Sequence, residues 1–244
     1  MFTAHYDTVH NFDGEQRVIV NDGFALLPNS SSSNCLGADC TAGVWLILQM
    51  IAAKVPGRYA IFADEEAGCV GSDHFASKPG TRLDGVQAVV SLDRAGYRDI
   101  ITHQAGQRTA SDAFARSVGS ILGMGYAPCD RGVMTDSLSF CDIVPECTNL
   151  SVGYFGQHSS AETQDLEHLA KLRDALILAD WSRVEIVRDP ATCVSRYSMR
   201  DFGDFGDFDD YSSRKGRTSR RSSYLDPSVI DDMDLADFVS CYPA

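Results

Sequence analysis

Three short apolar segments of the sequence each run directly into side chains that could bind a metal ion or transfer a proton. These are Phe2-Thr3-Ala4 before His5, Tyr59–Ala63 before Asp64-Glu65-Glu66, and Val89–Leu92 before Asp93. Parallel strands present ligand sites at their carboxyl ends, so we expect these side chains to meet at one edge of a sheet. Adjacent acids at the end of a buried strand repel one another unless they share a cation or a proton. The pattern therefore indicates a metal site or a proton-transfer site.

Two further clusters supply candidates of the same kind. Asp39 precedes a helical pattern, so it could be a metal ligand or simply the N-cap of that helix. His158 lies in the loop Gly156–Ser160, after an apolar stretch. Asp7, two residues beyond His5, would point the same way along a strand and could accept the second imidazole N–H. An H-x-D pair alone is more often structural than functional.

These candidates need a framework, and the first 190 residues or so alternate short apolar runs with longer helical patterns. This alternation is typical of an α/β sheet domain. The expected strands are Phe2–His5, Arg58–Ala63, Val86–Leu92, Asp99–Thr102 and Asn149–Gly153. The expected helices are Thr41–Lys54, Ser72–Ser77, Ser111–Leu122 and Glu167–Val187. The last helix should pack on a sheet, because its apolar stripe consists of Leu169, Leu172, Leu176 and Ala179.

Composition and charge limit the classes of function. The chain has 244 residues and a formal net charge of −13, which argues against nucleic acid as a partner of the main domain. No apolar run approaches the roughly 18 residues that span a bilayer, and no basic-then-apolar start suggests a secretory signal. The eight cysteines form no C-x-x-C pair, so we expect reduced thiols and a cytoplasmic protein that binds no membrane.

The composition changes near residue 195, which divides the expected domains into 1–195 and 196–244. Asp201–Asp210 repeats Asp, Phe and Gly, and Ser212–Ser223 is rich in Ser and Arg. Such segments cannot bury enough apolar surface to fold alone, so we predict a disordered C-terminal tail. Within it, Asp226–Val239 is acidic and amphipathic, and is either a transient helix or a docking peptide for a protein partner.

The sequence resembles the co-catalytic di-zinc exopeptidases in the order of its motifs, which are A-H-Y-D-T, G-A-D, D-E-E-A-G-C-V-G-S, S-L-D, T-D-S-L-S-F and Q-H-S. That superfamily includes bacterial leucyl aminopeptidases, glutamate carboxypeptidases and glutaminyl cyclases. The resemblance spans residues 1 to about 185. It implies the zinc exopeptidase (phosphorylase/hydrolase-like) fold, three layers with helices on both faces of a mixed, mostly parallel sheet. Family members have more strands before the first histidine, so we expect a minimal version or a start upstream of Met1.

The resemblance implies two metal sites, whose ligands would be His5, Asp39, Glu66, Asp93 and His158. Asp39 would bridge both ions, His5 and Asp93 would complete one site, and Glu66 and His158 would complete the other. Nitrogen and oxygen donors suit two Zn²⁺ ions, with Co²⁺ or Mn²⁺ as substitutes. Such a pair lowers the pKa of a shared water molecule and polarises the scissile carbonyl.

The resemblance also assigns roles to residues that are not ligands. Glu65 would be the general base that takes the proton of the water and passes it to the leaving amine. Asp7 would orient His5. Thr135-Asp136 and Phe140 resemble the Ser-Asp-His-x-x-Phe segment of the family, which helps to shape the substrate pocket.

The implied activity is zinc-dependent hydrolysis of a peptide bond or a related amide bond. Residues 94–157 leave no room for the inserted lid domain of the carboxypeptidase branch, which favours an aminopeptidase. A carboxypeptidase or deacylase that acts on acyl-amino acids remains an alternative. So does a protein of another class, a non-catalytic binding protein with a vestigial site and a partner-docking tail.

Overall fold

The computed structural model describes residues 1–10, 16–78 and 83–193. The chain divides into two units, Met1–Asp204 and Phe205–Ala244, and the second lies outside the described residues. The predicted tail, 196–244, lies outside them as well. All the described helices and strands belong to the first unit.

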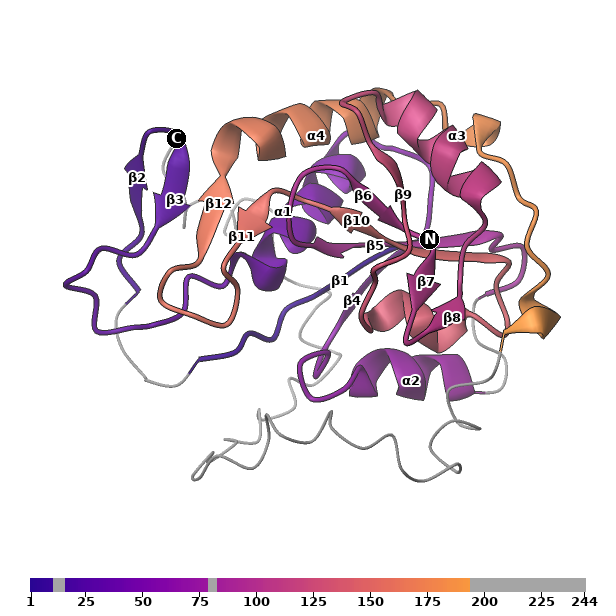
Figure 1. Ribbon diagram of the computed structural model, residues 1–244, viewed down its shortest axis with the longest axis horizontal. Helices are drawn as coiled ribbons and strands as arrows, with labels where there is room; N and C mark the ends of the chain where they lie inside the picture. Colours follow the sequence, from indigo (N-terminus) through magenta and orange to yellow (C-terminus); the bar gives the residue numbers. More distant parts are fainter. Residues whose placement is uncertain (11–15, 79–82, 194–244) are drawn as a thin grey trace. The chain divides into compact units, whose positions relative to one another are not determined.

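A six-stranded sheet forms the centre of the first unit (Figure 1). Its strands are β1 (Phe2–His5), β4 (Tyr59–Phe62), β5 (Ala88–Arg94), β6 (Asp99–Ile101), β9 (Ala127–Cys129) and β10 (Glu146–Ser151). The order across the sheet is β4-β1-β5-β10-β6-β9, and of these pairs β10–β6 alone is antiparallel. The mixed, mostly parallel sheet predicted from the sequence is confirmed.

Helices cover both faces of this sheet, which gives the three layers expected (Figure 1). They are α1 (Ala38–Ala52), α2 (Val70–Ser77), α3 (Asp112–Leu122) and α4 (Leu166–Leu178). One buried cluster joins α1, α3 and α4 to the sheet through side chains such as Leu46 and Phe114. On the other face, α2 and the 3-10 turn η1 (Asp136–Phe140) pack around Val89. No helix in the described part of the chain is long and apolar enough to cross a membrane.

A second sheet of four antiparallel strands was not predicted from the sequence. Its strands are β2 (Ile19–Asn21), β3 (Phe24–Leu26), β11 (Tyr154–Phe155) and β12 (Thr163–Asp165), in the order β11-β12-β3-β2. Strands of two or three residues are too short to show an alternating pattern. The same holds for the hairpin of β7 (His103–Gln104) and β8 (Gln107–Arg108). Strands β11 and β12 flank the loop that carries His158, so their pairing fixes both ends of that loop.

Helix α4 is shorter than predicted, since it ends at Leu178 and not at Val187. Ala179 is extended, and the Asp180 side chain then accepts a backbone N–H of the 3-10 turn η2 (Trp181–Arg183). A short polar side chain that bonds nearby backbone in this way offers the chain an alternative to the helix. The predicted apolar stripe is nevertheless buried at Leu169, Leu172 and Leu176.

A disulfide joins Cys141 to Cys193, so the prediction of reduced thiols is wrong for this pair. Their Cα atoms are 5.9 Å apart, but 52 positions separate them along the chain, and no short sequence motif predicts the pairing. The bond attaches the end of the described chain to the turn that follows η1. Disulfides persist mainly in oxidising compartments, so this one gives no support to the predicted cytoplasmic location.

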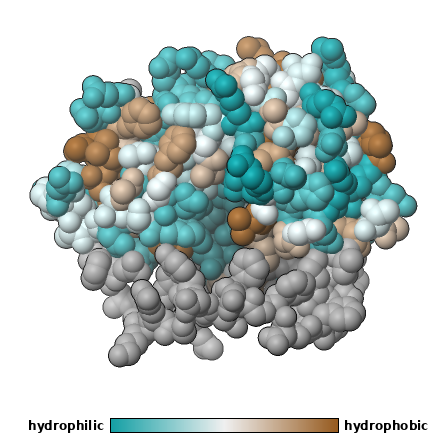
Figure 2. Space-filling view, in the orientation of Figure 1, coloured by the Kyte–Doolittle hydropathy of each residue, from teal (hydrophilic) through white to brown (hydrophobic). Residues whose placement is uncertain are grey.

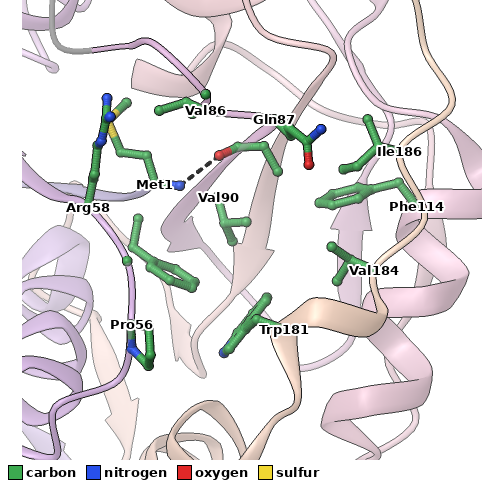
Figure 3. Close-up of a pocket in the computed structure, with 14 residues that line it drawn as sticks. Met1, Pro56, Arg58, Val86, Gln87, Val90, Phe114, Trp181, Val184 and Ile186 are labelled. Atoms are coloured by element: carbon green, nitrogen blue, oxygen red, sulfur yellow. Dashed lines mark hydrogen bonds between the residues drawn. The ribbon is translucent and has the colours of Figure 1, made fainter.

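The amino ends of β4, β1 and β5 surround an apolar pocket of about 290 Å³ (Figure 3). Phe114 of α3, Trp181 of η2 and Val90 of β5 contribute side chains to it. The Trp181 ring meets the Phe2 ring edge-on, with 4.8 Å between their centroids. The polar ammonium group of Met1 has an acceptor, the Ala88 carbonyl at 2.7 Å. This edge of the sheet is therefore stabilised by ordinary apolar burial.

Candidate active site

The carboxyl ends of the same three strands bring the predicted side chains together at the opposite edge of the sheet. His5 is the last residue of β1, Glu65 and Glu66 follow β4, and Asp93 lies near the end of β5. His5 is in register with Phe62, so the acids that follow β4 begin just beyond the imidazole. The His5 Nε2 atom lies 3.2 Å from Asp93 Oδ1.

Asp39 lies between two imidazole rings. Its Oδ1 atom is 3.2 Å from His5 Nε2, and its Oδ2 atom is 3.2 Å from His158 Nε2. Glu66 Oε1 lies 2.9 Å from the same nitrogen of His158. The two oxygens of one carboxylate therefore face two separate donor groups, His5 with Asp93 on one side and His158 with Glu66 on the other.

These donors fit a pair of metal ions that share one carboxylate. Ligand atoms of His5, Asp39 and Glu66 lie within 4.8 Å of one another. Imidazole nitrogen and carboxylate oxygen are donors that zinc prefers. His5, Cys40 and Asp93 meet the same spacing, but the buried Cys40 thiol donates to a backbone carbonyl of β5 at 3.2 Å. The geometry thus favours carboxylates over sulfur.

Burial places several ionisable groups in unusual states. Burial disfavours a charged His5, yet the negative groups and acceptors around it raise its pKa far above the ordinary value. Hydrogen bonds to the carboxylates of Asp39 and Glu66 raise the pKa of His158 to about 10. Burial also opposes a charged Asp39, but its bonds to His158 and His5 lower its pKa. The acids thus hold positive charge on both imidazoles, and the same negative field would attract divalent cations.

Adjacent Glu65 and Glu66 have different surroundings. Glu66 contacts His158, whereas Glu65 Oε2 stays 3.8 Å from His5 Nε2, too far for a hydrogen bond. Burial, followed by the negative charge of Asp93, raises the pKa of Glu65 to about 9. Burial raises the pKa of Glu66 as well, although its hydrogen bond to His158 opposes the rise. Glu65 is therefore the acid of the pair that remains outside the two donor groups.

Asp7 supports the turn after β4 in addition to His5, the residue that it was predicted to orient. His5 Nδ1 is 2.9 Å from the backbone oxygen of Asp7 and 3.5 Å from its carboxylate Oδ1. The carboxylate accepts the backbone N–H groups of Glu65 at 3.1 Å and Glu66 at 3.0 Å. Asp7 thus fixes the segment that carries the two glutamates as well as one imidazole.

Three residues hold Asp93 in place. Thr135 Oγ1 donates to its Oδ2 atom at 2.7 Å, and Asn149 Oδ1 accepts its backbone N–H at 3.1 Å. The Tyr154 hydroxyl donates to its carbonyl at 2.7 Å. Sequence analysis singled out Thr135 but missed Asn149 and Tyr154, because no spacing rule connects residues of different strands.

The segment that was expected to shape the substrate pocket makes other contacts. Phe140 packs against Phe62, with 6.0 Å between the ring centroids. Asp136 is buried, and burial raises its pKa to about 7. The preceding residues Val133 and Met134 instead line a pocket over the candidate ligands, and their side chains are well exposed.

A pocket of about 290 Å³ lies over the candidate ligands. Asp39, Glu65 and Glu66 line it together with the apolar Val133 and Met134. The pocket therefore offers an acidic wall beside an apolar one. The face of the molecule seen in Figure 2 is hydrophilic over much of its area, with hydrophobic patches scattered across it.

The sheet topology and the grouped imidazoles and carboxylates at its carboxyl edge define an α/β metallohydrolase. Residues 1–131 match peptidase family M28, and the chain belongs to that family. The resemblance to the co-catalytic zinc exopeptidases that the sequence motifs showed is confirmed. Family and site together make the protein a metallopeptidase. No curated protein matches the sequence.

Solved structures share the fold at low sequence identity. Aminopeptidase PepT from Bacillus cereus is 15% identical and superposes with a TM-score of 0.57, over 72% of this chain and 79% of that one. A tripeptidase from Staphylococcus aureus is 13% identical, with a TM-score of 0.54 and the same shares of 72% and 79%. The TET1 peptidase of Pyrococcus horikoshii is 22% identical, with a TM-score of 0.51 over 68% of this chain and 53% of that one.

Proposed function

We propose that the protein is a zinc-dependent aminopeptidase that binds two zinc ions through His5, Asp39, Glu66, Asp93 and His158. One observation carries the proposal. The two oxygens of Asp39 lie 3.2 Å from two different imidazoles, each of which has a further carboxylate as its neighbour. Two zinc ions bound there would supply Lewis-acid polarisation of the scissile carbonyl and acidify the attacking water.

Glu65 would act as the general base. It is partly buried beside the donor groups but contacts neither imidazole at hydrogen-bond distance, so it can take a proton from water and give it to the leaving amine. Its pKa of about 9 belongs to the protein without a metal ion. Cations held by the neighbouring ligands would lower that pKa and favour the ionised form that a base requires.

The short segment between Asp93 and His158 favours an aminopeptidase over a carboxypeptidase, because its 64 residues leave no room for an inserted lid domain. Binding the free carboxylate of a peptide would also call for an unpaired cationic side chain in the pocket. Arg94 also lines the pocket, but its guanidinium is already paired with Asp99 at 3.3 Å. The apolar wall of Val133 and Met134 would receive the side chain of the first residue.

Metal analysis and one substitution test this function. We expect about two zinc ions per chain, and we expect Glu65→Gln to retain them while turnover falls by about 10²–10⁴-fold. Glu167→Gln is the matched control, because Glu167 is exposed and pairs with Lys171 in α4. A folded wild-type protein that binds no zinc, or a fully active Glu65→Gln, would refute the proposal.

A separate test shows whether the protein recognises the amino end or the carboxyl end of its substrate. Wild-type protein should hydrolyse aminoacyl amides and unblocked dipeptides, and should leave N-acylated amino acids intact. The reverse preference would establish the carboxypeptidase or deacylase alternative.

The boundary near residue 195, the protein partner of the tail and the cytoplasmic location remain predictions.

A further inference from the structure

Glu162 is a buried acid beside the candidate metal ligands that has no role in the function proposed above. It is 3% exposed and lies just before β12, on the loop that carries His158. Its Oε2 atom accepts the backbone N–H of Gly37 at 2.9 Å, and its Oε1 atom accepts that of Asp39 at 2.9 Å. One carboxylate thus connects two segments that each carry a candidate ligand.

The two N–H groups need an acceptor from elsewhere in the molecule. They belong to the start of α1, where backbone N–H groups have no partner within the helix. Gly37, the N-cap residue, has a positive φ of 77° and no side chain with which to accept them. Glu162 therefore caps the start of α1 from a distant loop. In other helices, the side chain of a Ser or Asp at the N-cap often has this role.

The two N–H groups explain why the residue is an acid, because each is accepted by a different oxygen and a neutral amide side chain has one acceptor oxygen. The carboxylate is buried close to Asp39, and like charges in a region of low polarity disfavour one another. Burial raises the pKa of Glu162, and its bonds to the Asp39 and Gly37 amides oppose that rise. A neutral amide at this position would avoid the repulsion but would leave one of the two N–H groups without its acceptor.

We propose that Glu162 is a positioning residue for the metal site: it clamps the backbone of Asp39 to the His158 loop, so that the two carboxylate oxygens of Asp39 face separate imidazoles. The inference rests on the proposed function, since the clamp has a purpose only if Asp39 bridges two ions. Charged second-layer acceptors of this kind typically change metal affinity by about 10–100-fold.

The chain offers a matched control in Glu146. This acid is also fully buried and also accepts backbone N–H groups from distant segments, those of Ser111 at 2.6 Å, Val187 at 2.8 Å and Arg188 at 2.9 Å. It lies at the start of β10, whose carboxyl end points to the metal site, and it contacts none of the proposed ligands. In both Glu162→Gln and Glu146→Gln, an amide NH₂ replaces an oxygen that accepted a backbone N–H.

The experiment compares the two variants with the full-length wild-type protein. Both variants should unfold at a lower temperature. Zinc titration should show affinity reduced by about 10–100-fold in Glu162→Gln and unchanged in Glu146→Gln. In metal-free protein, hydrogen exchange at the Gly37 and Asp39 amides should accelerate in Glu162→Gln and keep the wild-type rate in Glu146→Gln. Glu162→Asp keeps the charge but shortens the reach, so its zinc affinity should fall between those of wild type and Glu162→Gln.

Equal zinc affinity in wild type and Glu162→Gln would overturn the inference and leave Glu162 as a helix cap. If Glu162→Gln does not fold, Glu162→Asp decides the matter by the same titration. A wild-type protein that binds no zinc would refute the proposed function instead. In that case the exchange rates still show whether Glu162 clamps the Asp39 segment, and unchanged rates would refute the clamp as well.

Discussion

The two edges of the central sheet carry pockets of the same volume, about 290 Å³, that are built on opposite principles. At the amino edge, Phe114 and Trp181 line a mainly apolar pocket, and the half-buried ammonium group of Met1 has a carbonyl partner. At the carboxyl edge, buried acids such as Asp39 and Asp93 surround His5 at hydrogen-bond distances. The first edge is lined mainly by apolar side chains, whereas the second concentrates negative charge.

This difference shows what each edge contributes to the protein. Apolar burial stabilises the fold, whereas buried like charges oppose it unless a cation or a proton neutralises them. The carboxyl edge holds protons on its imidazoles when no metal ion is bound, as the raised pKa of His158, about 10, indicates. The amino edge therefore adds to stability through apolar burial, and the carboxyl edge makes stability depend on metal and on pH.

The largest expected effect on stability is at the amino edge. Phe114 is fully buried and lines the apolar pocket, so Phe114→Ala should lower the free energy of unfolding by about 3–5 kcal/mol. Denaturant unfolding measures this loss. Leu178→Ala is the control, because Leu178 is 82% exposed and its truncation should change stability by about 0.5 kcal/mol or less. A loss of similar size in both variants would mean that the amino edge is not the stabilising region.

Zinc binding should have the next largest effect on stability, and it should act through the carboxyl edge alone. Binding to the folded state alone stabilises it by about 2.7 kcal/mol when free zinc is 100 times its dissociation constant. The pockets share no lining residue, so Phe114→Ala should gain the same increment as wild type. Thermal unfolding with zinc and with a chelator measures both increments. A smaller increment in Phe114→Ala would show that the two edges are coupled.

The parts of this comparison that the sequence predicted are those with a local signal. Apolar runs that end in His5, Glu66 or Asp93 are visible in the chain, and parallel pairing brings such ends together. Five strands of the central sheet and its helices were predicted from such runs and periods, whereas the three-residue strand β9 was missed and β10 begins three residues earlier than predicted. The sequence did not decide whether Asp39 caps a helix or binds a metal ion, because an Asp at the start of a helix fits both roles.

The parts that were missed depend on contacts between distant segments. Glu162 accepts N–H groups from residues more than 120 positions away, and a single acid after a loop gives no sign of this. Asn149 and Tyr154 hold Asp93 from other strands, and Cys141 pairs with Cys193 across the fold. One sequence signal does connect Glu162 to the site. Glu162 follows His158 by four residues, so both belong to one loop.

The last expected effect concerns pH, and it comes from Glu65 in metal-free protein. Burial raises its pKa from an ordinary 4.5 to about 9, so between these values the folded state keeps a proton that the unfolded state has released. This contribution to stability is fully present below pH 4.5 and is lost as the pH rises toward 9. The stability of the wild type should therefore fall more steeply with pH than that of Glu65→Gln, by at most about 1.4 kcal/mol per pH unit. Denaturant unfolding at several pH values, with chelator present, measures the two slopes. Glu167→Gln should keep the wild-type slope, and parallel slopes for wild type and Glu65→Gln would show that Glu65 ionises normally at the carboxyl edge.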